Sequence, residues 1–441
     1  MKIFYALIIL LLFQNCSFDN KTGIWKNENE PSAKEKNIFS EFKNLSSSNE
    51  VFNEIIVLRK NYKFKIPNKI TNLNWRDVFY DKTNNIKNFT YNELNQLAFK
   101  TKKLSKYNIN NLILFENNNV IFSDQKGNIN IFSSSENKAI IKFNFYKKKY
   151  KNINKSLNLI VENNIIYVSD NIGYLYAYDY SKNKILWAQN YKIPFGSNIK
   201  IFKNKLIAAN QNNILYFFNK FDGQLLKFIP TEDTKIKNEF INNISLNEKN
   251  TYFLNTYGSL YAINNETLKI IWYLNLNPSL DITPSNLFRG TQLVNYGNTV
   301  SVSTNQFTYV LESNTGAIIY KKNFISSIKP ILLSDYLFTV TKNNLLVAMD
   351  LKDGSVIYSY NINRKIAELL KIKKKNISIK DVAILNGKIF IFLHNSYVLK
   401  FNINGSLEDA YKLPTKIGTH PIFVEKSILY LSSKNKLSII D

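Results

Sequence analysis

Few side chains in this sequence have the chemistry of a catalytic nucleophile or a metal ligand. The 441 residues contain one cysteine, Cys16, and two histidines, His394 and His420. A single thiol excludes an intramolecular disulfide, and two imidazoles are too few for a histidine-rich metal site. The sequence has no G-x-S-x-G motif and no phosphate-binding glycine loop. We interpret His394, which lies in an apolar segment, as a packed core residue, and we expect no catalytic residue, metal or cofactor.

Four acidic residues stand at the same place in a repeated unit of sequence. They are Asp179, Glu312, Asp350 and Asp441. A catalytic acid or base needs one special environment, whereas a position that recurs along the chain indicates a structural part of a turn. We therefore interpret these carboxylates as turn residues.

The repeated unit that carries them has a turn residue, a short apolar strand, the acidic or Asn position, a second turn, and a strand that ends in a large residue. Its copies occur at 126–141, 172–187, 212–227, 257–272, 305–320, 343–358 and, more loosely, 395–411. The first turn is held by Gly127, Gly173, Asn213, Gly258, Gln306, Asn344 and Asn395. The second turn is held by Asn183-Lys184, Asp222-Gly223, Thr315-Gly316, Asp353-Gly354 and Asn404-Gly405. Glycine and asparagine tolerate the positive φ that tight hairpins require, so each copy predicts two strands joined by a hairpin.

The spacing of the copies predicts the architecture. Successive copies are about 38 to 51 residues apart, which leaves room for two further strands in each unit. Four strands at that period are typical of a β-propeller blade. Segments such as 345–349 are apolar on both faces, as expected for a blade packed between two neighbours.

The two ends of the repeated region predict how the ring closes. The last segment, 434–441, reproduces the unit up to Asp441 and lacks its final strand. An isolated strand at 72–80 contains Trp75, which fits the place of Trp187 and Trp272 in complete units. Borrowing that strand would remove both exposed sheet edges. We therefore predict an all-β, eight-bladed β-propeller of four antiparallel strands per blade over residues 67–441, closed by an N-terminal strand.

The N-terminal segment predicts export. Residues 3–13 form an apolar run that is too short to span a bilayer comfortably and is typical of a signal peptide. The cysteine that follows resembles a bacterial lipoprotein signal, although Phe13 and Asn15 depart from its preferred residues. The resemblance implies a signal peptide at 1–15, lipid on Cys16, and a tether and extension over 16–66. Within that extension, 49–60 fits a helix by spacing and a strand by composition.

The formal net charge is +25, from 58 basic and 33 acidic residues. Only Arg59, Arg76, Arg289 and Arg364 are arginines, and the lysines are spread along the chain apart from one run at 371–375. Nucleic-acid sites favour clustered arginine, so we interpret the charge as the composition bias of an AT-rich genome. A propeller that binds an envelope polyanion stays an alternative.

The pattern G-x-L-Y-A-x-D followed by G-x-x-x-W resembles the PQQ-like propeller repeat. A lipidated, eight-bladed member of that group is similar to the BamB family, accessory lipoproteins of the outer-membrane β-barrel assembly (BAM) machinery. The resemblance covers about 67–441 and begins with "IPNKITNLNW" at 66–75. It implies a non-catalytic scaffold on the periplasmic face of the outer membrane. Its implied partners are BamA, the rest of the BAM complex and nascent outer-membrane β-barrel proteins, and it implies a role in their folding and insertion.

One loop, "NPSLDITPSNLFRGTQLV" at 277–294, resembles the family's BamA-binding loop. The resemblance implies partner binding by Pro284, Ser285, Leu287, Phe288, Arg289 and Gly290. An aromatic anchor beside a rare arginine suits an interface, with Gly290 permitting a tight turn. Without the resemblance, the residues alone favour a Phe288 packed under its blade and an Arg289 in a local salt bridge. The family's second, Asp-rich contact is absent at 325–332.

Quinone-dependent dehydrogenases share this repeat, so a PQQ-dependent quinoprotein is the alternative enzyme class. Those enzymes typically use adjacent cysteines, a bound calcium and a catalytic Asp in the channel. This chain has one cysteine, which the lipoprotein reading assigns to the lipid. We therefore predict that it is not an enzyme.

Overall fold

The computed structural model describes residues 16–18, 25–27, 51–233, 240–277, 288–370 and 377–441. It has two units, Met1–Glu50 and Val51–Asp441. In the first, β1 (Cys16–Phe18) pairs antiparallel with β2 (Trp25–Asn27). The predicted signal peptide at 1–15 lies outside the described residues.

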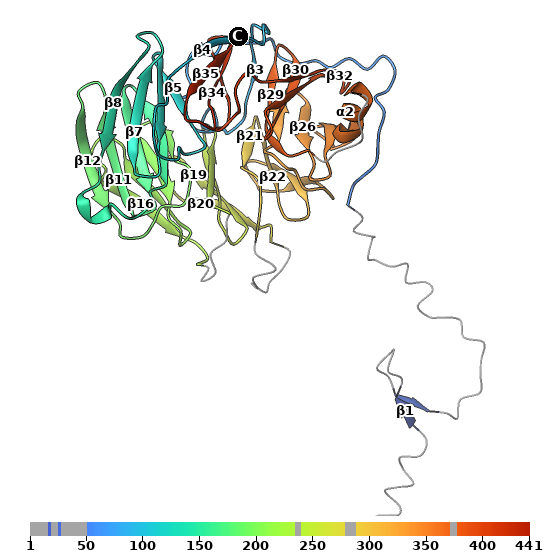
Figure 1. Ribbon diagram of the computed structural model, residues 1–441. Coiled ribbons are helices and arrows are strands. Elements are labelled where there is room, and N and C mark those ends of the chain that lie inside the picture. The colour runs from blue at the N-terminus through green and yellow to red at the C-terminus, as the bar shows by residue number, and fades with distance from the viewer. Residues whose placement is uncertain (1–15, 19–24, 28–50, 234–239, 278–287, 371–376) are drawn as a thin grey trace, which may run out of the picture. The chain divides into compact units, whose positions relative to one another are not determined.

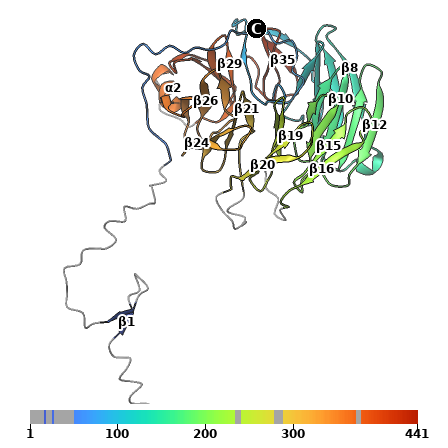
Figure 2. The same ribbon diagram turned by 180° about the vertical axis from the view of Figure 1, so that it is seen from behind.

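The second unit is a ring of eight blades (Figures 1 and 2). Blade 1 contains β5 (Leu114–Glu116), β6 (Asn119–Ser123), β7 (Asn128–Ser133) and β8 (Lys138–Asn144). Blade 2 contains β9 (Leu157–Glu162), β10 (Ile165–Asp170), β11 (Tyr174–Asp179) and β12 (Lys184–Asn190). Blade 3 contains β13 (Lys200–Phe202), β14 (Lys205–Ala209), β15 (Ile214–Asn219) and β16 (Leu225–Pro230). Blade 4 contains β17 (Asn243–Leu246), β18 (Asn250–Leu254), β19 (Ser259–Asn264) and β20 (Ile270–Asn275).

The second half of the ring repeats the arrangement. Blade 5 contains β21 (Val294–Tyr296), β22 (Thr299–Ser303), β23 (Thr308–Glu312) and β24 (Ile318–Lys322). Blade 6 contains β25 (Ile331–Leu333), β26 (Tyr336–Val340), β27 (Leu345–Asp350) and β28 (Val356–Asn361). Blade 7 contains β29 (Ile379–Leu385), β30 (Lys388–Leu393), β31 (Tyr397–Asn402) and β32 (Leu407–Lys412). Blade 8 contains β33 (Ile422–Val424), β34 (Ser427–Leu431), β35 (Leu437–Ile440) and β4 (Leu97–Lys100). The predicted eight-bladed, all-β propeller is therefore confirmed.

An N-terminal strand closes the ring, as predicted, but the strand is a different one. The chain-terminal β35 pairs antiparallel with β4, where Ser438 lies opposite Lys100. The assignment of the closing strand to 72–80 is wrong. Trp75 instead exchanges backbone hydrogen bonds with Phe115 on the inner strand of blade 1, and its N–H lies 2.7 Å from the Phe115 carbonyl oxygen. Both candidate strands are short and partly apolar, so only the pairing distinguishes them.

Residues 70–91, which we call the plug, cross one end of the central channel. The plug makes backbone hydrogen bonds to inner strands of blades 1, 2, 4, 5 and 7, and side-chain hydrogen bonds join it to blades 3 and 6. Leu246 N–H donates to the Lys82 carbonyl at 2.8 Å, and Asn295 N–H donates to the Thr83 carbonyl at 3.1 Å. Farther along, β3 (Asn88–Phe89) pairs in parallel with the end of β29. The plug therefore replaces water as the partner of the inner strands at this end of the channel.

A buried ion pair fixes the plug to blade 3. The Lys200 ammonium, which is fully buried, lies 2.7 Å from the Asp77 carboxylate and donates to the Asp81 carbonyl at 2.9 Å. Burial raises the pKa of Asp77 and lowers the pKa of Lys200, because removal from water disfavours both charged forms. The Asn84 carboxamide donates to the carbonyls of blades 4 and 5 beside this pair. The Lys200 ammonium, the Asp77 carboxylate and the Asn84 carboxamide therefore have these hydrogen-bond partners only when the plug is in place.

The two turns of each unit follow the sequence prediction closely. The second-turn residues with positive φ are Asn183, Gly223, Gly316, Gly354 and Gly405. Of the first-turn residues, Gln306 and Asn395 lack positive φ, and Ser396 adopts it at 73° instead of its neighbour Asn395. Three of the four recurring carboxylates, Asp179, Glu312 and Asp350, accept backbone N–H groups of the turn that follows them, as predicted. Asp441 corrects the prediction, because its carboxylate accepts the hydroxyl of Ser427 on the neighbouring strand instead.

The segment before the plug lies along the outside of blades 5 and 6 as extended chain. Phe52 N–H donates to the Asn323 carbonyl at 2.7 Å, and Ile56 bridges Ser359 of β28. The sequence left 49–60 open between a helix and a strand. Its described part, 51–60, is extended chain with one isolated β-bridge, at Ile56. Two helices occur in the described chain, η2 (Lys148–Tyr150) and α2 (Ile362–Leu370). No helix in the described ranges is long and apolar enough to cross a membrane.

Candidate functional site

The described part of the predicted BamA-binding loop borders a hollow of about 710 Å³, which we call the Arg289 hollow. Four loops of blades 5 and 6 build it, and backbone hydrogen bonds join them in pairs. Thr291 N–H donates to the Ser303 carbonyl at 2.9 Å, and Lys342 N–H donates to the Ile325 carbonyl at 2.8 Å. The lining residues are Arg289, Gly290, Thr291, Ser303, Thr304, Asn305, Ile325, Ser326, Ser327 and Lys342. The hollow is polar and carries two cations.

Phe288 corrects the expectation of an aromatic surface anchor. Its side chain is only 2% exposed and packs edge-on against Phe240, with ring centroids 5.2 Å apart. The ring also fills the space beside Gly258, where an added Cβ would lie 2.6 Å from it. Phe288 therefore packs under blade 4, because burying its apolar ring is more favourable than exposing it to water at the loop. In this position its side chain is unavailable to a partner.

Arg289 has the opposite environment. Its side chain is exposed, its backbone N–H donates to the Asn305 carboxamide oxygen, and its guanidinium forms no ion pair with the described residues. Gly290 is required by close approach rather than by a tight turn, since an added Cβ would lie 2.9 Å from the Ser303 carbonyl oxygen. Pro284, Ser285 and Leu287 lie outside the described residues. Partner binding by Arg289 and Gly290 stays a prediction.

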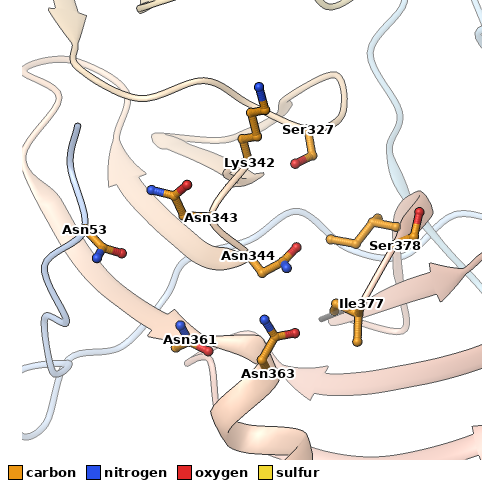
Figure 3. A pocket seen from close by; sticks show the side chains of 10 residues that line it. Asn53, Ser327, Lys342, Asn343, Asn344, Asn361, Asn363, Ile377 and Ser378 are labelled. Carbon is orange, nitrogen blue, oxygen red and sulfur yellow. The ribbon is translucent and has the colours of Figure 1, made fainter. Parts of the chain in front are cut away.

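A second hollow of about 720 Å³ adjoins the first and shares Ser327 and Lys342 with it (Figure 3). Side-chain amides dominate this amide hollow: Asn53, Asn343, Asn344, Asn361 and Asn363 line it. An amide both donates and accepts hydrogen bonds, so this surface matches the backbone of an extended chain or a hydroxyl-rich molecule. The sequence did not predict this hollow, because its asparagines come from three separate segments that the fold brings together.

A third, smaller hollow of about 320 Å³ lies in the central channel and also includes Ser327. Its charged residues are Lys329, Lys380, Asp381 and His420. His420 Nδ1 lies 2.9 Å from Asp381 Oδ2. The other histidine, His394, corrects the sequence interpretation: it follows β30 and is exposed, not packed in the core. Partial burial, with the nearby Lys380 as a lesser cause, lowers the pKa of His394.

The side chains that line the three hollows are suited to binding a partner more than to catalysing a reaction. Within the described ranges, no group of three or more His, Cys, Asp or Glu side chains is placed to hold a metal ion. The basic run at 371–375 lies outside the described residues. The chemically distinctive groups are exposed or half-buried cations, Arg289, Lys342 and Lys329, beside uncharged amides and hydroxyls. Such groups bind carboxylates and carbonyl oxygens.

Comparison with known proteins agrees with this fold. Residues 147–360 match a family model described as outer membrane protein assembly factor BamB. The structure of BamB from Moraxella catarrhalis superposes with a TM-score of 0.62 at 10% identity and covers 78% of this chain and 99% of that one.

Other solved propellers are similar at the level of the fold. Quinohemoprotein alcohol dehydrogenase from Comamonas testosteroni gives a TM-score of 0.59 at 11% identity and covers 83% of this chain and 80% of that one. A computationally designed protein, Ika8, gives 0.59 at 11% identity, with 78% and 99% covered. A search of curated protein sequences finds no match. In its matched repeats and its eight-bladed fold, this chain is similar to the PQQ-repeat propellers of the BamB type.

Proposed function

We propose that this protein is a non-catalytic scaffold of the outer-membrane β-barrel assembly machinery that docks on BamA and assists folding and insertion of outer-membrane proteins. The observation that carries the proposal is the match of 147–360 to the family model of the assembly factor BamB. The eight-bladed ring supports it, because a closed ring with a plugged channel is a rigid platform for surface loops.

The Arg289 hollow is the docking site in this proposal. Arg289 is exposed and its guanidinium has no ion pair with the described residues, so its charge is available to a carboxylate or carbonyl group of a partner. Lys342 lines both the Arg289 hollow and the amide hollow and extends the cationic surface between them. The contribution of Pro284, Ser285 and Leu287 belongs to the same proposal.

The location follows from the same proposal. Cys16 carries the lipid, the chain is anchored to the outer membrane on its periplasmic side, and the residues after Cys16 tether the ring. Metabolic labelling with a palmitate analogue tests this step. Label on the wild type and none on Cys16→Ser is the expected result, and label on both chains would show that the anchor lies elsewhere.

A pull-down from detergent-solubilised envelopes tests the docking. We compare the wild type with Arg289→Glu and with Lys227→Glu, which makes the same charge change on the exposed outer strand β16 of blade 3. BamA should come down with the wild type and Lys227→Glu and be lost with Arg289→Glu. Recovery of BamA with all three proteins would remove Arg289 from the interface, and its absence from the wild-type sample would contradict the proposed function.

A quinoprotein dehydrogenase is the second candidate, favoured by the fold similarity to quinohemoprotein alcohol dehydrogenases. The plug argues for the scaffold, because the chain's own residues occupy one end of the channel and bond to its inner strands. Two measurements on the purified protein decide between the candidates. Denaturation releases any bound quinone, which is detected by its absorbance, and elemental analysis measures calcium. A stoichiometric quinone would favour the enzyme.

A further inference from the structure

The small hollow in the channel lies at the end opposite the plug's backbone contacts. The plug pairs with the later residues of inner strands, such as Phe115 and Leu385, whereas this cavity is lined largely by residues that precede inner strands, such as Leu112 and Pro421. Plug residues including Phe79 also line the cavity. The plug therefore forms one wall of a cavity of about 320 Å³ and separates it from the end of the channel that the plug itself covers.

Most of the cavity wall is apolar. Leu112, Val382 and Phe423 contribute from blades 1, 7 and 8, and Phe79 and Ile86 contribute from the plug. The side chain of Ile241, which also lines the cavity, is 52% exposed, so the cavity opens to solvent near blade 4. A cavity of this size and lining accommodates one aromatic or branched aliphatic group.

Two lysines bring positive charge to this apolar cavity. Lys329 Nζ donates to the carbonyl oxygens of Asn84 at 2.8 Å and Phe79 at 3.2 Å, which leaves its third N–H for another acceptor. Lys380 is 9% exposed, and its ammonium has no hydrogen bond or ion pair among the described residues. Burial lowers the pKa of both lysines, because their charged forms are poorly solvated.

The placement of Lys380 is a specific feature of blade 7. In the pairing of β29 with β30, Ile379 lies opposite Leu393 and Asp381 lies opposite Phe392, so Lys380 is the extra residue of a β-bulge. A bulge redirects a side chain that regular alternation would send elsewhere. As a result Lys380 lines the channel cavity, together with its neighbour Asp381, while Ile379 lines the amide hollow.

Asp381, the carboxylate that lines the cavity, is already engaged. Asp381 Oδ2 lies 2.9 Å from His420 Nδ1, whereas the Lys380 ammonium makes no hydrogen bond to Asp381. The cavity therefore presents two cations and a shared carboxylate within apolar walls. The Lys380 side chain is largely buried and its ammonium has no partner among the described residues, so an anionic ligand would give that charge a favourable interaction.

We propose that this cavity binds a carboxylate carried on an aromatic or aliphatic body, with Lys380 and Lys329 holding the carboxylate and the apolar walls holding the body. Two sources have this chemistry: the C-terminal residue of a peptide and a free aromatic carboxylic acid. The proposal does not depend on docking to BamA.

Isothermal titration calorimetry of the full-length protein in detergent tests the proposal. The probes are N-acetyl-phenylalanine as the free acid, the same compound as its amide, and naphthalene-2-carboxylate. The acids should bind at least about tenfold more tightly than the amide, the loss expected when a charge-assisted hydrogen bond is removed. The tighter of the two acids identifies the source, since only the acetylated amino acid carries a peptide group.

Variants locate the site. Lys380→Gln should weaken both acids by about tenfold or more, Lys380→Arg should retain binding, and the matched surface variant Lys227→Gln should bind as the wild type does. Equal binding of acid and amide overturns the proposal, as does the absence of binding by both acids at millimolar concentration. Unchanged binding by a correctly folded Lys380→Gln protein also overturns it. If that variant does not fold, the comparison of acid with amide on the wild type still decides.

Discussion

The indole of Trp187 in blade 2 lies directly against Gly223 in blade 3. A Cβ added at Gly223 would be 2.4 Å from the Trp187 ring, and Trp187 Nε1 donates to the Lys220 carbonyl at 3.0 Å. The same relation joins Trp272 to Gly316, and tyrosine replaces tryptophan beneath Gly354 and Gly405. An aromatic residue on the outer strand of one blade thus packs under the second turn of the next blade, which links neighbouring blades.

Replacing Gly223 with alanine should therefore destabilise the ring. The new methyl group meets the Trp187 ring, and φ of 73° is unfavourable for alanine, so we expect a loss of about 2 kcal/mol or more in the free energy of unfolding. Gly297→Ala is the matched control, because Gly297 also has positive φ but has no atom within 4 Å of the added Cβ. Urea unfolding monitored by tryptophan fluorescence measures both. Equal losses in the two variants would show that the interblade contact contributes nothing.

The buried pair that holds the plug should be sensitive to loss of one partner. Lys200→Met leaves the Asp77 carboxylate buried without its cation, and such changes cost about 3–5 kcal/mol. The exposed pair Lys203–Glu266 is the control, and Lys203→Met should cost at most about 1 kcal/mol. The double variant Lys200→Met, Asp77→Leu should recover part of the loss. Chemical denaturation of the four proteins gives the comparison, and similar losses for Lys200→Met and Lys203→Met would contradict a tightly held plug.

Closure of the ring by β4 predicts a specific cross-link. Residues 100 and 438 lie directly opposite each other, so their Cβ atoms are close enough for a disulfide. In a Cys16→Ser background, Lys100→Cys with Ser438→Cys should oxidise to an intramolecular disulfide, visible by mass spectrometry of unreduced peptides. Lys102→Cys with Ser438→Cys is the control and should stay reduced. A disulfide in the control but not in the test pair would mean that the register is wrong.

The burial of Lys329 predicts a dependence of stability on pH. Burial lowers the pKa of this lysine from 10.5 to about 8, so between these values the unfolded chain binds more protons than the folded protein. Stability contributed through Lys329 should therefore rise with pH, by up to about 1.4 kcal/mol per pH unit. Lys380, Asp381, Lys200, Asp77, Asp81 and His420 are charged or titratable groups in the same region.

The difference between the wild type and Lys329→Met isolates that contribution. We expect the free energy of unfolding of the wild type to rise relative to that of the variant as the pH increases from 8 to 9.5. Tyrosine ionisation in the unfolded chain affects both proteins equally and cancels in the difference. Denaturant titrations at three pH values in this window measure it. A difference that does not change with pH would show that Lys329 keeps an ordinary pKa.

Sequence periodicity was sufficient to predict the eight blades and most of their turns. The reason is local: a turn residue such as Gly173 or Gly223 needs positive φ, and an outer-strand aromatic such as Trp187 needs a small residue opposite it. These requirements repeat with every blade, so they leave a visible pattern. Asp179, Glu312 and Asp350 were correctly interpreted as turn residues for the same reason, since each accepts backbone N–H groups only two or three positions away.

Tertiary structure decided what depends on partners distant in sequence. The sequence pattern assigned the closing strand to 72–80, and only the pairing of Lys100 with Ser438 identifies 97–100 as the strand that closes the ring. Phe288 fitted an exposed anchor until its contact with Phe240 placed it inside. The plug and the Lys380 bulge have no periodic signal, because each occurs once and is held by inner strands that are far away along the chain. Repeated local constraints can be read from sequence, whereas single long-range contacts are determined only when the ring closes.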